Sequence, residues 1–296
     1  MATAMSFDGQ LQHGIGKLSP AERRVARFFQ QNREQVLIAS AAALAEQIGT
    51  SDATVVRTVK SLGYSGMEEM RQILAGELRQ SLSPAGRMER TLNQVGDDLQ
   101  AAFEMTLGIH QNSLENLRRD ISPQQFRNAI ESILAARRVF IFGIGPSSAM
   151  AEYFRIQLGR FGIGAQSLTD TGVLLADGIQ QFKAGDLLMI FAYGRVYREL
   201  AVLLDQADRK GLGKILFTDT LGPDLRGRVN LILPVARGSA DMLSMHTATL
   251  ALIEALLVGV ATERPHETID SLEALNRMRS ALAGKSMDLP SPSTGK

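Results

Sequence analysis

The chain of 296 residues contains no cysteine and no tryptophan, and the first absence narrows its chemistry. Without cysteine there is no disulfide bond, no thiolate metal ligand and no cysteine nucleophile. The net charge is only +1, which gives no overall attraction to nucleic acid, membranes or acidic ligands. Contact with DNA would therefore depend on a local group of side chains.

Long apolar runs are also missing. The longest apolar segment, Ala248–Ala261, is interrupted by Glu254 and is too short to span a bilayer. The first residues lack the basic stretch and apolar core of a secretory signal peptide. We therefore expect a cytoplasmic protein without membrane contact. Its length exceeds that of one typical domain, so two domains are expected.

The most informative segment spans residues 40–64, where a tight polar turn joins two short helical patterns. The first pattern, Ala41–Ile48, ends at Gly49, a residue that tolerates the positive φ of a helix end. N-cap residue types, Thr50–Asp52, then open a second helix that stops at Gly63. This arrangement predicts a helix-turn-helix within an all-helical domain over residues 1–80.

The second helix has an apolar set and an open polar face. The apolar set is Val55, Val56, Val59 and Leu62. The open face combines short hydrogen-bonding side chains with two cations, which suit phosphates and base edges in the DNA major groove. The predicted DNA contacts are Ser51, Asp52, Thr54, Arg57, Thr58 and Lys60. Arg57 is the expected base or phosphate reader, and Asp52 fits an N-cap better. An ordinary αα-hairpin with a solvated polar face is the alternative.

After residue 80 the sequence changes character twice. Residues 81–98 carry Ser83-Pro84, Gly86 and alternating charges, which predicts a hinge, and residues 81–122 as a whole predict a helical linker. From Arg138, short apolar runs alternate with helices, which is typical of a parallel sheet covered on both faces. The expected strands are Val139–Phe142, Ala165–Leu168, Asp186–Phe191, Lys214–Thr218 and Asn230–Val235.

The fold class is therefore an all-α helix-turn-helix domain followed by an α/β domain. The second domain, over residues 123–283, is expected to be a three-layer α/β/α sandwich with a five-stranded parallel sheet. Ala240–Val260 is expected as a long closing helix, and a disordered tail is expected over residues 284–296.

A glycine-rich loop, Gly143–Ser148, follows the first expected strand. In open parallel sheets, ligands bind where such loops meet helix N-termini. The dinucleotide fingerprint fails here because its third glycine would fall on Ser148. No cofactor, metal site or catalytic residue is predicted, and turn residues that only cap a helix are the alternative interpretation of this loop.

Together the two halves resemble RpiR-type bacterial transcription regulators, which join a helix-turn-helix to a sugar isomerase (SIS) domain. The resemblance covers Leu18 to Val260 and rests on a set of matching residues in each half. They are Ala45, Gly49, Ser51, Thr54-Val55 and Arg57, then Leu62-Gly63-Tyr64-Ser65-Gly66, and finally Phe142-Gly143-Ile144-Gly145-Pro146-Ser147-Ser148. Thr58 departs from the family, which usually has an aromatic residue there. The implied partners are a double-stranded DNA operator and a small metabolite.

The resemblance implies an effector pocket with an unusual lining. SIS domains that hold a phosphosugar typically show Ser-x-Ser-Gly-x-Thr after the third strand, whereas this chain has Phe191-Ala192-Tyr193-Gly194-Arg195-Val196. The expected lining residues are Gly145, Ser147, Ser148, Tyr193, Gly194, Arg195, Arg198 and Ser239, with Ser239–Asp241 as a third wall. Two arginines without the hydroxyl cradle favour a differently shaped anion, such as a sugar acid or another carboxylate, over a common phosphosugar.

Two alternative functions remain open at this stage. A sugar-phosphate isomerase needs a base near the last strand, but Val235–Ile253 contains no glutamate, and Asp241 and His246 are the only candidates. An enzyme is therefore not expected. The SIS domain could instead serve only to dimerise the protein. A homodimer or homotetramer is expected in either case, because symmetric regulators read paired half-sites.

Overall fold

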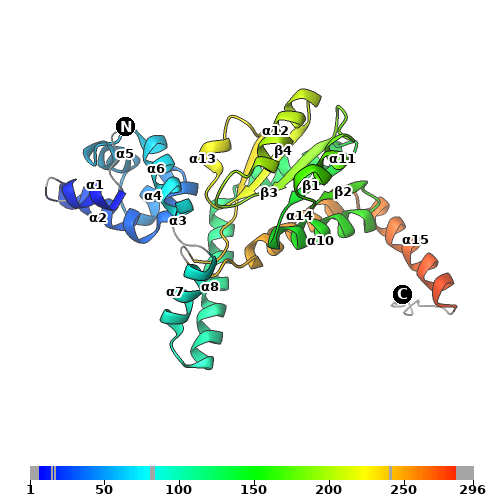
Figure 1. Ribbon diagram of the computed structural model, residues 1–296, viewed down its shortest axis with the longest axis horizontal. Helices are drawn as coiled ribbons and strands as arrows, with labels where there is room; N and C mark the ends of the chain where they lie inside the picture. Colours follow the sequence, from blue (N-terminus) through cyan, green and yellow to red (C-terminus); the bar gives the residue numbers. More distant parts are fainter. Residues whose placement is uncertain (1–6, 15, 17, 81–83, 240–241, 285–296) are drawn as a thin grey trace, which may run out of the picture.

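The computed structural model describes residues 7–14, 16, 18–80, 84–239 and 242–284. A bundle of helices forms its N-terminal part (Figure 1). Its helices are α1 (Phe7–Gly14), α2 (Pro20–Gln31), α3 (Arg33–Ile38), α4 (Ala41–Ile48), α5 (Asp52–Ser61) and α6 (Met67–Gln80). Phe7, Phe29, Leu44 and Met70 are fully buried in one core. Helices α1 and α3 supply part of this core and are not among the predicted elements.

The turn between α4 and α5 has the predicted geometry. Gly49 adopts the left-handed conformation, with φ of 69°, and ends α4. Ser51 then caps α5 by accepting a hydrogen bond from the backbone N–H of Thr54. The helix-turn-helix therefore follows directly from local residue preferences.

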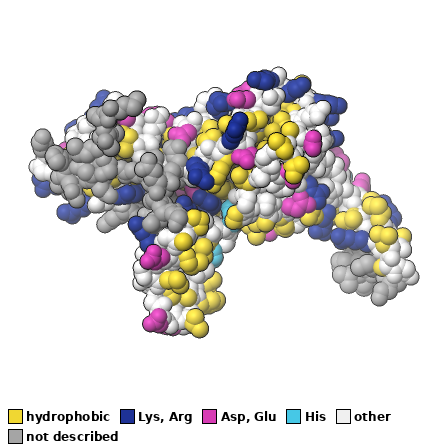
Figure 2. Space-filling view, viewed as in Figure 1, with side chains coloured by type: hydrophobic (Ala, Val, Ile, Leu, Met, Phe, Trp, Pro, Cys, Tyr) yellow, Lys and Arg dark blue, Asp and Glu magenta, His cyan; other side chains and the backbone are white. Residues whose placement is uncertain are grey.

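Two helices, α7 (Pro84–Val95) and α8 (Leu99–Asp120), connect this bundle to the sheet. The predicted hinge is therefore mostly helical, since Pro84 takes the first helical position, where its missing N–H is tolerated. The α7–α8 pair projects from the molecule, and hydrophobic side chains are exposed along it (Figures 1 and 2). Leu99 is 87% exposed and Phe103 is 56% exposed.

The C-terminal part contains a five-stranded parallel sheet in the order β2-β1-β3-β4-β5. The strands are β1 (Val139–Gly143), β2 (Ala165–Leu168), β3 (Leu187–Phe191), β4 (Gly213–Thr218) and β5 (Leu231–Pro234). The strand prediction is confirmed to within one residue at each end. The apolar run of β1 is continuous because Val139 and Ile141 face one helical layer while Phe140 and Phe142 face the other.

Helices cover both faces of the sheet and make the three-layer sandwich (Figure 1). One layer consists of α9 (Pro123–Ala135), α10 (Pro146–Arg160) and α14 (Thr247–Glu263), and the other of α11 (Leu175–Ile179), α12 (Arg198–Lys210) and α13 (Gly222–Leu225). A short 3-10 helix, η2 (Gly172–Leu174), precedes α11.

The predicted bounds of the closing helix, Ala240–Val260, are wrong at both ends, since α14 spans Thr247–Glu263. It begins at Thr247, seven residues later than predicted, and a further helix, α15 (Pro265–Ala283), follows α14 and projects from the sandwich (Figure 1). Gly284 ends α15 with φ of 66°. The tail predicted to be disordered otherwise lies outside the described residues, as does Asp241.

Candidate functional site

The exposed face of α5 differs from the predicted one. Arg57 and Lys60 are exposed, and Asp52 and Ser61 lie on the same side of the helix. Ala53 and Val56 occupy this face too, although sequence analysis had not included them among the contacts. The exposed face therefore combines two cations with small and apolar side chains, which can contact phosphates and thymine methyl groups.

Thr58 is a clear correction, because it is fully buried and cannot reach DNA from this position. Its hydroxyl donates to the Thr54 carbonyl at 2.8 Å, which satisfies the polar group inside the bundle. Thr54 is half-buried, and its hydroxyl is 2.9 Å from that of Ser51, so both serve the helix cap. The signal was present, since Thr58 shares the 3.6-residue apolar stripe of Val55 and Leu62.

The predicted effector loop lies at the carboxyl edge of the sheet, between β1 and α10. Gly145 has φ of 59°, and the Ser148 hydroxyl donates to its carbonyl at 2.7 Å. Gly143 permits the close approach, because a Cβ there would lie 2.5 Å from the carbonyl oxygen of Ser147. Ser147 is buried, and Ser148 is the loop hydroxyl that remains half-exposed. The N-terminus of α10 thus opens onto this edge.

At the same edge, Tyr193 stands at the sequence position of the second serine in the family motif. Its ring is 7% exposed, and its hydroxyl is 2.9 Å from that of the fully buried Thr249. Burial raises the pKa of the Tyr193 phenol above its ordinary value, so the phenol is neutral. The guanidinium carbon of Arg237 lies 4.4 Å from the centre of the ring.

Arg237 is the functional candidate that sequence analysis missed. Its Nε donates to the Asp219 carboxylate at 3.0 Å, and both side chains are largely buried. The His246 ring lies edge-on to the Tyr193 ring, with 5.6 Å between the ring centres. Burial, followed by the charge of Arg237, lowers the pKa of His246 to about 4. The prediction placed His246 inside the closing helix, whereas the structure has it as the N-cap residue of α14. No spacing rule links Arg237 to Asp219, because the pair forms only across the sheet edge.

The structure does not bring all the predicted effector residues into one pocket. Gly145, Ser148 and Gly194 lie on neighbouring loops, but Arg195 is exposed and stacks on Tyr197 at 4.4 Å. Arg198 lines a groove between α11 and α12 instead. Ser239 lines a separate cavity with residues of α3 and α8. Order along the chain does not fix the direction in which a side chain points, so the sequence did not separate Arg198 and Ser239 from this pocket.

Within the described ranges, no helix has the length and apolar character needed to cross a membrane. Among the same residues, no group of three or more histidine or acidic side chains is arranged to hold a metal ion.

Comparison with known proteins supplies two family matches, one in each half of the chain. Residues 5–81 match the family described as "Helix-turn-helix domain, rpiR family", and residues 132–259 match the SIS domain. The HTH-type transcriptional regulator HexR of Pseudomonas aeruginosa is 28% identical over 280 residues, which cover 92% of this chain and 94% of HexR.

Two solved structures share the fold at lower identity. The Vibrio vulnificus NanR protein, complexed with ManNAc-6P, has a TM-score of 0.56 and 22% identity, covering 94% of this chain and 99% of NanR. The sugar isomerase domain of an RpiR transcription factor from Sphaerobacter thermophilus has a TM-score of 0.53 and 23% identity, covering 58% of this chain and 96% of that domain. Both likenesses concern the fold alone.

Proposed function

Since this chain belongs to the rpiR family of helix-turn-helix transcriptional regulators that carry a SIS domain, we propose that its operator binding is controlled by a small anionic metabolite. The exposed face of α5 is the observation that carries the DNA-binding role. Arg57 and Lys60 stand there on a helix whose opposite side, with Val55 and Val59, is fully buried. A rigidly held, partly cationic helix face is what major-groove docking requires.

The metabolite-sensing role is supported by the charges at the carboxyl edge of the sheet. Arg237 lies within the fold at this edge, and the 15-residue helix α10 presents its N-terminus there. The helix N-terminus favours an anion, whereas the charge of Arg237 is balanced by Asp219. Phe191 and Tyr193 are buried at positions where the family motif has small hydroxyl side chains that bind a phosphate. This difference favours a sugar acid, or a phosphosugar of a different shape. NanR, which has the same fold, was solved with a phosphosugar.

A direct test measures both DNA binding and ligand binding. Fluorescence anisotropy with the DNA upstream of the protein's own gene would measure affinity, and thermal shift with sugar phosphates and sugar acids would find the effector. A compound that stabilises the protein and also changes its DNA affinity at least fivefold is expected. DNA binding that no stabilising compound alters would contradict the sensing role.

The filled sheet edge also favours a second function, in which the SIS domain only dimerises the protein. The ring of Tyr193, the Arg237–Asp219 pair and Thr249 satisfy one another without a ligand. Under this alternative no compound would stabilise the protein, while DNA binding would remain intact. An isomerase alternative is tested by assaying the same sugar phosphates for turnover.

A further inference from the structure

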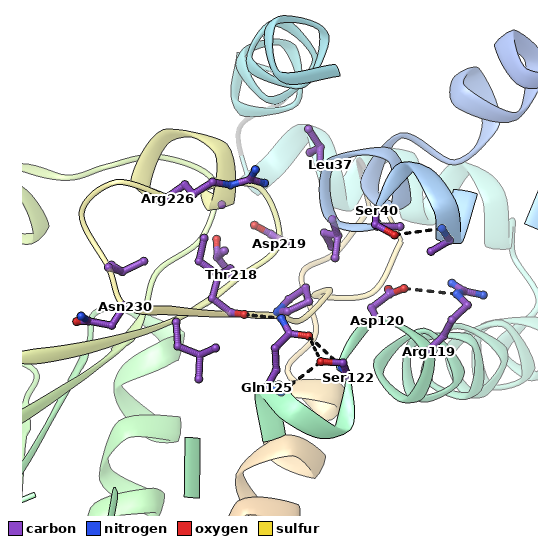
Figure 3. A pocket seen from close by; sticks show the side chains of 18 residues that line it. Leu37, Ser40, Arg119, Asp120, Ser122, Gln125, Thr218, Asp219, Arg226 and Asn230 are labelled. Atoms are coloured by element: carbon purple, nitrogen blue, oxygen red, sulfur yellow. Dashed lines mark hydrogen bonds and ion pairs between the residues drawn. The ribbon is translucent and has the colours of Figure 1, made fainter. Parts of the chain in front are cut away.

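A cavity of about 520 Å³ lies between the helical bundle and the sheet (Figure 3). This volume falls within the range of about 300–1,000 Å³ that is usual for small-molecule sites. Its walls come from the α3–α4 segment, the end of α8, the start of α9 and the loops around β4 and β5. Its polar side chains include those of Arg119, Asp120, Asp219 and Arg226.

The cavity depends on how the two parts of the chain dock. Helix α13 of the sandwich packs against α3 and α6 of the bundle. Arg226, which follows α13, forms an ion pair with Glu68 of α6 at 3.5 Å. A second contact joins Gln35 of α3 to Asn116 of α8 at 3.2 Å. A molecule bound in this cavity would therefore touch both parts and stabilise their docked arrangement.

Asp120 supplies an acceptor on one wall. Its side chain is only 7% exposed, and its single hydrogen bond among the described residues comes from the Arg119 Nε at a long 3.4 Å. Burial raises the pKa of this carboxyl, with the charge of Arg119 opposing the shift. A buried carboxyl with one weak donor is costly, and hydroxyl donors of a ligand would stabilise it. Asp120 therefore calls for a hydroxylated ligand.

Arg226 supplies a cation from the opposite wall (Figure 3). Its side chain is 60% exposed, and that of Glu68 is 46% exposed, so the ion pair between them contributes at most about 1 kcal/mol. The guanidinium can turn from Glu68 to a bidentate anion at little cost. The other acid in the wall, Asp219, is already neutralised by Arg237 at 3.0 Å and does not repel an anion.

We propose that this interdomain cavity binds a small polyhydroxylated anion, with its hydroxyls donating to Asp120 and its phosphate or carboxylate held by Arg226. The proposal rests on the function above and names a location for the effector that differs from the sheet-edge loops. Because the ligand contacts both parts, its binding energy is coupled to their arrangement, and hence to the position of α5 relative to DNA.

The test uses calorimetry to measure the affinity of the full-length protein for four compounds. They are glucose 6-phosphate, N-acetylmannosamine 6-phosphate, gluconate and inorganic phosphate. Asp120→Asn and Arg226→Gln are each expected to weaken the tightest of these at least tenfold. Asp177→Asn and Arg277→Gln are matched controls, since both residues are exposed and lie outside this cavity. Unfolding midpoints without ligand will show that each variant is folded.

Glu68→Gln separates ligand contact from domain docking. It removes the same ion pair as Arg226→Gln but leaves the guanidinium free, so affinity is expected to be unchanged or higher. An equal loss in both variants would overturn the ligand role of Arg226. Binding that survives in Asp120→Asn and Arg226→Gln but is lost in Arg237→Gln would overturn the interdomain site and leave the proposed function standing. If none of the four compounds binds, the interdomain site is overturned along with metabolite sensing by this class.

Discussion

At the scale of single residues, Arg57 and Lys60 are expected to make different DNA contacts from the exposed face of α5. Arg57 projects from the middle of the helix, whereas Lys60 lies in its last turn. A bidentate guanidinium can read a guanine edge, while an ammonium serves as a point charge near phosphate. The two side chains should therefore affect specificity and affinity differently.

Arg57→Ala is expected to weaken operator binding by about 1–3 kcal/mol and to relax preference at one base position. Lys60→Ala should weaken all sequences about equally and reduce the salt dependence of binding. Fluorescence anisotropy against single-base operator variants at two salt concentrations distinguishes these patterns. Arg277→Ala, on the distant α15, is the control. Unchanged affinity in Arg57→Ala would show that this helix does not read DNA.

A second residue-scale prediction concerns His246 and pH. Its pKa in the folded protein is about 4, below the ordinary value of 6.5, mainly because it is buried. The unfolded chain therefore binds an additional proton between these pH values, and stability falls as pH drops from 6.5 toward 4. His246→Gln should reduce this loss, which urea unfolding at pH 7.5 and 5.0 will measure. The same pH dependence in the wild type and the variant would contradict it.

At the scale of elements, the junction of β1 and α10 depends on Gly143. A Cβ at this position would lie 2.5 Å from the Ser147 carbonyl oxygen and 2.9 Å from its carbon, both backbone atoms that cannot easily move. Gly143→Ala is therefore expected to destabilise the protein by about 1–3 kcal/mol. Urea unfolding checks this result. Gly164→Ala is the control because no atom would lie within 4 Å of its Cβ, and an equal effect there would refute the steric argument.

At the scale of the whole molecule, large apolar side chains are exposed on several surfaces of the described residues, and two of these surfaces are candidates for association. One is the groove between α9 and α14, where Val258 is 67% exposed. The other is the α7–α8 projection, along which Figure 2 shows hydrophobic side chains and where Phe103 is 56% exposed. Exposed apolar surfaces of this kind are typical of association sites. A regulator that reads paired half-sites would use one of them to form a symmetric dimer.

Light scattering at micromolar concentration is therefore expected to give two or four times the chain mass of 32.2 kDa. Val258→Glu should lower this mass if α14 forms the interface, whereas Phe103→Glu should do so if the α7–α8 projection does. Val173→Glu is the matched control, since Val173 is 87% exposed near α11. A wild-type mass equal to one chain would rule out the dimer.

The sequence by itself determined the five strands, their order along the chain and the turn between α4 and α5. Gly49 and Ser51 specify the turn between α4 and α5 through backbone conformation and capping, which are local properties. Continuous apolar runs specify buried parallel strands, because both faces of such a strand contact helices. The exposed side of α5 was also within reach, had the apolar stripe been extended through Thr58.

Only the tertiary structure decided which distant side chains meet. Arg237 and Asp219 pair across the sheet edge, and Asp120 and Arg226 face one cavity although 106 positions separate them in the chain (226 − 120). Arg198, at the start of α12, and the loop residue Ser239 line separate cavities. These placements depend on how helices and loops pack against one another, and local sequence carries no information on such long-range contacts.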